Sequence, residues 1–236
     1  LNATKYIGNG CKVSFPNGET TGWQLTKDET YDGDLYLGAD TLDLNGHKLT
    51  VNGNLIQSVG TVFVNGGQLD ITGDYRIQSA VKGTNGAVTY GNSSGILKMT
   101  NEADYVKVGG SFITQSVTSH DNMLTAGTLE VKGDFTQSNA ANNSYYAFIS
   151  KGTHKVLLSG TKKQTVNFEF GNNLNYSHLN KLEITNTSPE GVEFAKVVCV
   201  ANELKNENTP IINGKKIYLA STGIIADNYW KYDLTF

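Results

Sequence analysis

The stretch TLDLNGHKLTVNGNLIQS, residues 41–58, decides the fold, because TVFVNGGQLDITGDYRIQS, residues 61–79, repeats it almost position by position. The second stretch begins 20 residues after the first, and its apolar positions, its Asn-Gly turn and its later Gly recur in order. Two looser copies, VKVGGSFITQS and LEVKGDFTQS, keep the alternating apolar residues, the Gly, the aromatic residue and the final Gln-Ser pair. Self-similarity at a fixed period of this size is typical of a repeat architecture.

Each repeat contains short pieces of alternating apolar residues, separated by turns that contain glycine. Leu42 and Leu44 form one such piece, and Leu49 and Val51 form the next. A period of two indicates half-buried β-strands, whereas an amphipathic helix needs apolar residues three and four positions apart. Three strands in about 20 residues fit one coil of a β-solenoid, and coils are stacked because one coil cannot bury its inward face alone.

We therefore predict an all-β protein with one domain, a single-stranded, right-handed parallel β-helix of about eight coils. The expected parts are an N-terminal cap over residues 1–34, coils over residues 35–220 and a C-terminal cap over residues 221–236. The Asn- and Ser-rich segment near residues 138–148 is expected to form a loop inserted between coils. Caps are expected because the open end of a solenoid leaves strand edges unpaired.

Stacking predicts that equivalent positions form ladders with a spacing of about 4.8 Å along the axis. The glutamines that end the repeats are expected to form one amide ladder, in which each side chain bonds the next. They are Gln57, Gln78, Gln115 and Gln137. A row of glutamines that binds a ligand is the alternative. The aromatic residues Tyr75, Phe112 and Phe135 occupy an apolar position of the repeat, so we expect them in the core.

The composition disfavours some classes of function. The chain has 236 residues and a formal charge of −3, whereas proteins that bind nucleic acid usually present a basic face. The sequence has no run of 18 apolar residues, so we expect no membrane insertion within this segment. Because the chain begins with Leu, we expect it to be a mature or excised part of a longer protein.

The two cysteines lie far apart and show no metal-ligand spacing. Cys11 precedes the first recognisable coil, and Cys199 follows about seven coils later, a separation of roughly 30 Å at ~4.8 Å per coil. A disulfide needs Cα atoms within about 7 Å of each other. We therefore predict two free thiols, with Cys11 in the cap and Cys199 near the packed wall of a coil.

Parts of the sequence resemble known families. LDLNGHKLTVNG resembles the coils of pectin-lyase-like right-handed parallel β-helices, over about residues 35–140. GTHKVLLSGTKKQTVNF and LNKLEITNTSPEGVEF resemble segments of large secreted or surface-displayed bacterial proteins of clostridial type, over about residues 148–220. These resemblances imply a solenoid fold and an extracellular or cell-surface bacterial location.

The pectin-lyase-like resemblance raises the question of catalysis on polysaccharides. The lyases of that family use clustered acidic Ca²⁺ ligands with a basic proton acceptor, and the related hydrolases place Asp residues on neighbouring coils. Carboxylates must converge within several Å to share acid and base roles. In the repeat alignment they do not, because Asp43 stacks on Phe63 and Asp70 stacks on Thr50.

Other chemistry-bearing residues favour structural roles. The single arginine, Arg76, is expected at the surface beside an acid. His120 and Asp121 are neighbours in the sequence, which rarely positions two side chains for catalysis. Asp74 and Asp134 follow glycines, where an Asp more often caps a turn than binds Ca²⁺. We predict no catalytic residue, no metal site and no cofactor.

Three tyrosines are the best binding candidates in the sequence. Tyr145, Tyr146 and Tyr176 lie in Asn-rich segments that interrupt the coil pattern, where solenoids often place a binding face. Their rings could stack on a sugar or contact a protein. The alternative is that they clamp the loops onto the side of the solenoid.

We therefore predict a non-catalytic module of a secreted or cell-surface bacterial protein, adhesin-like or acting as a stalk or scaffold. We expect a monomer whose partner is a glycan or a protein of the host or cell surface. The alternative is a polysaccharide-binding module or a pectate-lyase-like enzyme. Release of unsaturated or reducing sugar ends by the purified chain would separate the enzyme from the other two.

Overall fold

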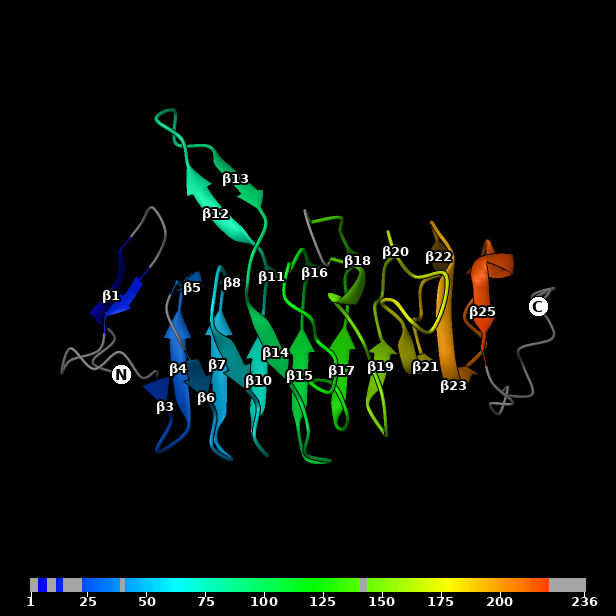
Figure 1. The fold of residues 1–236 in the computed structure, drawn as a ribbon, viewed down its shortest axis with the longest axis horizontal. Coiled ribbons are helices and arrows are strands. Elements are labelled where there is room, and N and C mark those ends of the chain that lie inside the picture. Colours follow the sequence, from blue (N-terminus) through cyan, green and yellow to red (C-terminus); the bar gives the residue numbers. More distant parts are fainter. Residues whose placement is uncertain (1–3, 8–11, 15–22, 39–40, 141–143, 221–236) are drawn as a thin grey trace.

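The computed structural model describes residues 4–7, 12–14, 23–38, 41–140 and 144–220. Over this part of the chain the structure is all-β except for two short 3₁₀ helices, η1 (Ser144–Tyr146) and η2 (Gly214–Lys216). Parallel strands stack into a β-solenoid of about eight turns, whose axis runs along the long direction of Figure 1. The predicted fold is confirmed. Neither helix of the described part has the length and apolarity needed to cross a membrane.

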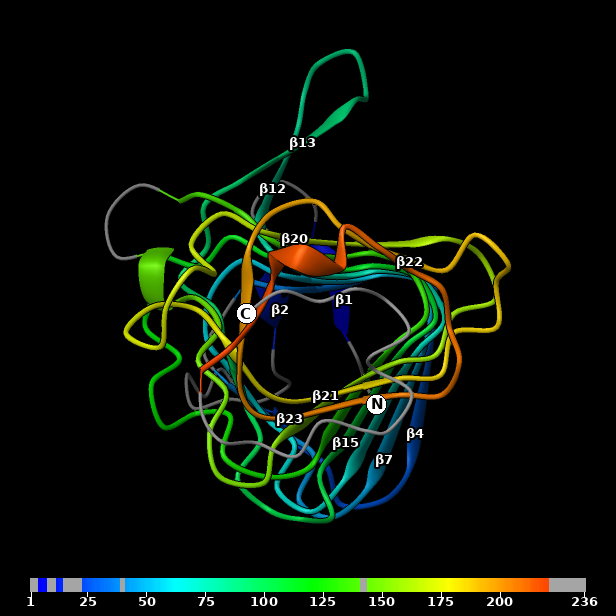
Figure 2. The same ribbon diagram turned by 90° about the vertical axis from the view of Figure 1, so that its right-hand side faces the viewer.

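Three parallel sheets form the walls of the solenoid, and the chain visits them in turn as a right-handed coil (Figure 2). The first wall contains β4 (Glu29–Asp32), β7 (Lys48–Asn52), β10 (Gln68–Ile71), β15 (Tyr105–Val108), β17 (Thr128–Val131), β19 (Lys155–Leu158), β21 (Leu179–Ile184), β23 (Val198–Asn206) and β25 (Ile217–Leu219). The second wall contains β5 (Leu35–Leu37), β8 (Leu55–Gln57), β11 (Tyr75–Ile77), β16 (Phe112–Thr114), β18 (Phe135–Gln137), β20 (Gln164–Phe168), β22 (Val192–Phe194) and β24 (Ile211–Ile212). The third wall contains β3 (Trp23–Gln24), β6 (Thr41–Asp43), β9 (Thr61–Phe63) and β14 (Ile96–Lys98).

The third wall becomes irregular after β14. Its continuation consists of isolated parallel bridges, which join Met99 to Leu124, Leu124 to Ser150, and Ile149 to His178. The first and second walls continue as sheets over the same coils. The third wall is therefore where the chain leaves the regular path and forms longer excursions.

Stacked aromatic rings fill the core behind the second wall. Tyr75, Phe112 and Phe135 have no exposed surface, which confirms their predicted position. The ring centroids of Tyr75 and Phe112 are 5.4 Å apart, and those of Phe112 and Phe135 are 5.1 Å apart, both edge to face. Such pairs contribute about 0.5–1.5 kcal/mol each beyond their burial. Phe148 and Phe168 extend the stack toward the irregular part of the third wall.

The corner between the first and second walls repeats a Gly followed by a short polar residue. A Cβ on Gly133 would lie 2.6 Å from the carbonyl carbon of Gly110, so the close approach of neighbouring coils requires glycine. The polar side chains bond the backbone of the next coil. Asp74 accepts from the amide of Ser111 at 2.8 Å, and Asp134 accepts from the amide of Thr165 at 2.7 Å. Both Asp residues therefore hold turns of adjacent coils together.

The expected ladder of four glutamines does not form. Gln78 donates to Gln115 at 2.7 Å, which is one rung of such a ladder. Gln57 instead accepts the hydroxyl of Tyr75 at 2.7 Å, and Gln137 lies in an inward column of the second wall. The reason is that β11 pairs with β8 without a bulge. The extra residue of the second repeat therefore shifts its glutamine to the next column.

The coils also begin earlier than residue 35. Strands β3 and β4 already pair with β6 and β7, so the first coil within the described residues includes Trp23. The repeat pattern did not reveal this coil in the sequence, because Glu29 occupies the position that the apolar Leu49 occupies in the next coil. Cys199 is free and buried, as predicted, whereas Cys11 lies outside the described residues. The predicted C-terminal cap, residues 221–236, lies outside them too.

Two antiparallel hairpins lie outside the three walls: β1 (Thr4–Ile7) with β2 (Lys12–Ser14), and β12 (Ser79–Lys82) with β13 (Val88–Gly91). The second hairpin projects from the solenoid (Figure 1) and was not predicted. Its signal in the sequence is Asn85-Gly86, with Gly86 at a φ of 81°. An Asn-Gly pair between alternating residues is a common hairpin turn.

Candidate functional site

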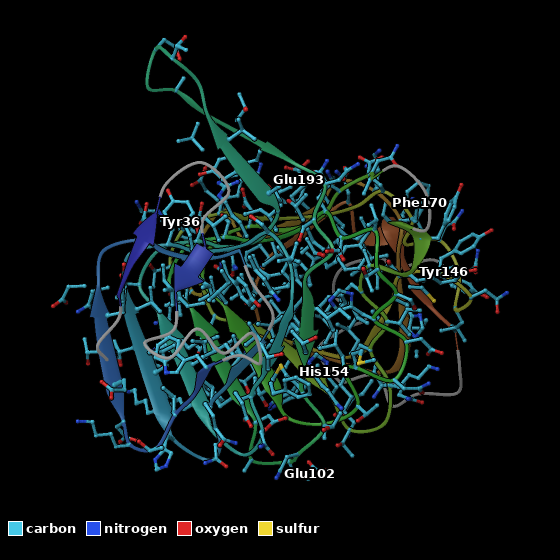
Figure 3. The ribbon with its side chains drawn as sticks, turned by 60° about the vertical axis from the view of Figure 1, so that its left-hand side comes forward. Tyr36, Glu102, Tyr146, His154, Phe170 and Glu193 are labelled. Atoms are coloured by element: carbon cyan, nitrogen blue, oxygen red, sulfur yellow. The ribbon has the colours of Figure 1, made fainter. Side chains whose placement is uncertain are left out.

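The candidate site lies beside the irregular part of the third wall. Two excursions meet there, one after β18 that includes η1 and one after β20. They bring the three predicted tyrosines together with one further aromatic residue, Phe170. We call this surface cluster the tyrosine flank: Tyr145, Tyr146, Phe170 and Tyr176. Figure 3 shows Tyr146 and Phe170 close together at the periphery of the molecule.

Tyr145 is the centre of the tyrosine flank. Its ring centroid lies 4.4 Å from that of Phe170, 5.2 Å from that of Tyr176 and 6.4 Å from that of Tyr146. Tyr145 remains 42 % exposed, while the other three are partly buried. The rings thus join the two excursions to each other and still leave aromatic surface open to a ligand. Phe170 was missed because it continues the alternation of β20 and looks like another core residue.

Backbone hydrogen bonds fix the flank on the solenoid. The amide of His120 donates to the carbonyl of Tyr146 at 2.8 Å, and the amide of His178 donates to the carbonyl of Phe148 at 2.8 Å. The hydroxyl of Ser177 donates to the carbonyl of Tyr145 at 2.9 Å. Because these bonds tie the excursions to neighbouring coils, the aromatic surface is preformed.

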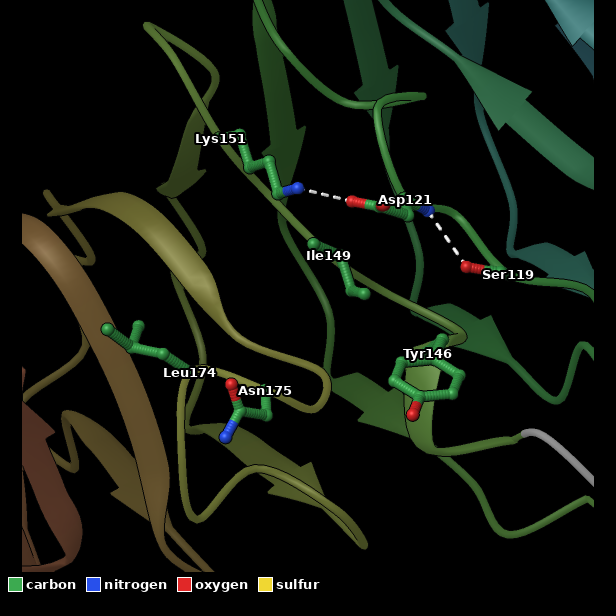
Figure 4. A pocket seen from close by; sticks show the side chains of 7 residues that line it. All are labelled: Ser119, Asp121, Tyr146, Ile149, Lys151, Leu174 and Asn175. Atoms are coloured by element: carbon green, nitrogen blue, oxygen red, sulfur yellow. Dashed lines mark hydrogen bonds and ion pairs between the residues drawn. The ribbon is translucent and has the colours of Figure 1, made fainter.

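A hollow of about 500 Å³ borders the flank (Figure 4), and we call it the flank hollow. It is lined by Ser119, Asp121, Tyr146, Ile149, Lys151, Leu174 and Asn175. Asp121 forms an ion pair with Lys151 across its upper edge, and its amide donates to the hydroxyl of Ser119 at 3.1 Å. The exposed Leu174 and the half-buried Tyr146 give the opposite side an apolar surface. A ligand with both apolar faces and hydroxyl groups fits this combination.

The His120-Asp121 pair does not form a catalytic unit. The His120 ring is buried, with Nδ1 3.2 Å from the carbonyl of Thr118 and Nε2 accepting from the amide of Leu97 at 3.2 Å. Burial lowers the pKa of His120 to about 4, so the ring is neutral at physiological pH. The carboxylate of Asp121 points to the surface and pairs with Lys151. The two side chains therefore act in different environments.

Two more histidines lie buried near the flank. His154 Nδ1 is 2.8 Å from the hydroxyl of Ser150, and its buried Nε2 has no hydrogen-bond partner in the described part of the chain. Burial lowers the pKa of His154 to about 3. The pKa of His178 is lowered as well, chiefly by burial. These neutral rings support the irregular wall from inside.

The flank hollow has few charged residues. Asp121 is the single carboxylate among the residues that line the flank hollow, whereas glycoside hydrolysis generally uses a pair. Within the described residues no cluster of three or more His, Cys, Asp or Glu side chains is placed to hold a metal ion. Arg76 lies elsewhere, 2.7 Å from Asp74 and 4.4 Å above the ring of Tyr90. It secures the projecting hairpin, in agreement with its predicted pairing with an acid.

No protein-family model, no curated protein and no solved structure matches this chain. The two features that bear on function are the tyrosine flank and the flank hollow beside it.

Proposed function

We propose that this chain is a non-catalytic, adhesin-like module of a secreted or cell-surface bacterial protein. In this proposal the solenoid is the stalk and the tyrosine flank contacts a glycan. The observation that carries it is the exposed ring of Tyr145, backed by Phe170 and Tyr176 beside the flank hollow. The bacterial surface setting is supported by the resemblance of residues 148–220 to segments of clostridial-type surface proteins.

A glycan fits the chemistry of this surface. A sugar ring has an apolar face of C–H groups, which can stack on an aromatic face such as that of Tyr145. Its hydroxyl groups need hydrogen-bond partners, which Ser119, Asp121 and Asn175 offer in the flank hollow. A ligand that stacked on the ring could therefore also satisfy polar groups a short distance away.

The solenoid supports a binding role by holding the site in place. Its first and second walls run the length of the stack, and the excursions that carry the tyrosines are bonded to neighbouring coils. A preformed site loses less conformational entropy on binding than a mobile loop. The stack therefore acts as a rigid support for a contact surface.

A glycan array on the purified chain tests the proposal. We expect a glycan that binds the wild type and binds Tyr145→Ala on the order of tenfold more weakly, because the stacking face is lost. Tyr218→Ala is the matched control, since Tyr218 is 46 % exposed on β25 and lies outside the flank. Unchanged binding by Tyr145→Ala would contradict the proposal. Release of reducing or unsaturated sugar ends would instead establish an enzyme.

A further inference from the structure

A second hollow lies at the corner between the first and second walls. Its volume is about 400 Å³, and it is lined by Gly109, Ser111, Lys132, Gly133, Asp134, Thr161, Lys162 and Lys163. We call it the lysine hollow. It forms where the connection between β19 and β20, residues 159–163, is longer than the connection between β17 and β18, residues 132–134. The longer connection passes over the shorter one, where a Cβ on Gly160 would lie 2.5 Å from the carbonyl oxygen of Lys132.

A buried amide fixes the overhanging connection. The side chain of Gln164 donates to the carbonyls of Val131 at 3.0 Å and Gly133 at 2.6 Å. It also accepts from the amide of Gly160 at 2.9 Å and from the side chain of Asn186 at 2.7 Å. Because Gln164 is 1 % exposed, these bonds are shielded from water. The shape of the lysine hollow is therefore set before any ligand arrives.

The lysines around the hollow differ in whether they form an ion pair. Lys163 forms an ion pair with Glu193 at 2.6 Å, and Asp134 already accepts a backbone hydrogen bond from the next coil. Lys132 and Lys162 are exposed and make no ion pair with the residues that the structure describes. Two ammonium groups, those of Lys132 and Lys162, thus face the solvent without an ion pair, while the carboxylates of Asp134, Glu190 and Glu193 lie around Lys163.

We propose that the lysine hollow binds an anionic substituent, a sulfate or carboxylate group, of the same glycan that the tyrosine flank contacts. Lys132 and Lys162 supply the positive charge, and the hydroxyl groups of Ser111 and Thr161 supply further hydrogen-bond donors. The identity of the ligand as a glycan rests on the proposed function. The anion site itself rests on the residues of the hollow alone.

The topology places both sites at the ends of the same strands. Lys163 directly precedes β20, and Phe170 of the tyrosine flank lies just beyond its end. A strand of this length, Gln164–Phe168, extends about 17 Å. Between the two sites, Thr136 of β18 and Asn167 of β20 lie side by side on the outer face of the second wall. An extended glycan along these strands would reach the lysines at one end and the tyrosines at the other.

The test uses three polymers that share one backbone: dextran, carboxymethyl dextran and dextran sulfate. We expect the wild type to bind at least one of the anionic polymers more tightly than dextran, and the preference between them identifies the group. The double variant Lys132→Gln/Lys162→Gln should bind that polymer roughly tenfold more weakly, because two charge contacts are lost. Added salt should weaken binding of the wild type more than binding of the variant.

The control is Lys27→Gln/Lys98→Gln, which removes the same charge from residues outside the hollow. An equal loss in both double variants would mean that only net charge matters, and would overturn the proposal. Equal binding of dextran and both anionic polymers by the wild type would do the same. A neutral glycan whose binding survives Tyr145→Ala would contradict the proposed function but leave the anion site standing, so the two failures are distinguishable.

Discussion

The first and third walls of the solenoid are built by the same repeats but differ in how regularly their strands pair. The first wall keeps nine parallel strands from β4 to β25, with one register shift between β21 and β23. The third wall is a sheet only as far as β14, and then continues as single bridges while the chain makes excursions to the surface. The comparison teaches that regular repetition specifies the stack, whereas interruptions of the repeat create the surfaces that can bind.

The outer face of the first wall carries a column of charged side chains, one from each of several coils. Side chains there stack at strand spacing, so like charges on adjacent coils would repel. Asp70 is followed by Lys107 and then by Glu130, and Glu183 pairs with Lys205 at 3.0 Å. Charges of opposite sign therefore alternate along much of this column, which suits a structural face.

Aromatic substitutions should separate the two kinds of region most strongly. Phe135→Ala should lower the free energy of unfolding by about 3–5 kcal/mol, because the ring is fully buried in the stack. Tyr145→Ala should cost less than about 1 kcal/mol, because the ring is at the surface. Denaturant titration of both variants measures the difference. Equal losses would show that the tyrosine flank is part of the core.

Acid should destabilise the third wall before the first. His120 and His154 have folded-state pKa values of about 4 and about 3, below the unfolded value of about 6.5. A depressed histidine pKa means that the unfolded chain takes up protons first, so stability falls as the pH drops below about 6.5. Between pH 7 and pH 5 we expect a loss of roughly 2 kcal/mol for each ring.

Urea titrations at the two pH values measure this loss. His120→Gln should remove roughly 2 kcal/mol of this loss, because its side chain does not titrate while its amide oxygen can still accept the hydrogen bond from Leu97. Wild-type midpoints that coincide at pH 7 and pH 5 would contradict the account. Amide exchange at pH 5 should rise first in residues 144–150, next to the buried rings.

The sequence predicted the regular part of the fold and little of the irregular part. Leu49 and Leu69 share a column as expected, because a repeat with a constant period places equal residues over one another. Phe170 and the lysine hollow could not be predicted, since each depends on the length and path of a connection. A single inserted residue was enough to move Gln78 out of the column of Gln57.

Glycine substitutions compare a crowded corner with an open turn. Gly133→Ala should lower the free energy of unfolding by about 2–3 kcal/mol, because the new Cβ would overlap the backbone of the neighbouring coil. Gly86→Ala should lower the free energy of unfolding by about 1 kcal/mol. The new Cβ would meet no atom within 4 Å, and only the φ of +81° is unfavourable. Thermal unfolding of both variants measures these two losses of stability. A larger effect at Gly86 would show that the corner can relax.

A substitution that loosens the projecting hairpin should have the smallest effect on stability. Arg76→Gln removes an ion pair with Asp74 and a cation–π contact with Tyr90. We expect faster amide exchange in β12 and β13 and a local loss of about 0.5–1 kcal/mol. The midpoint of global unfolding should stay unchanged, because the hairpin lies outside the stacked walls. A marked shift of that midpoint would mean that Arg76 also supports the second wall.

The most direct test of the account is amide hydrogen exchange of the full chain with and without the glycan that ranks highest on the array. The account predicts added protection in residues 144–150 and 170–178, which carry the tyrosine flank, and no change in the strands of the first wall. Protection confined to the first wall, or to the projecting hairpin, would contradict the claim that the interrupted wall carries the binding surface.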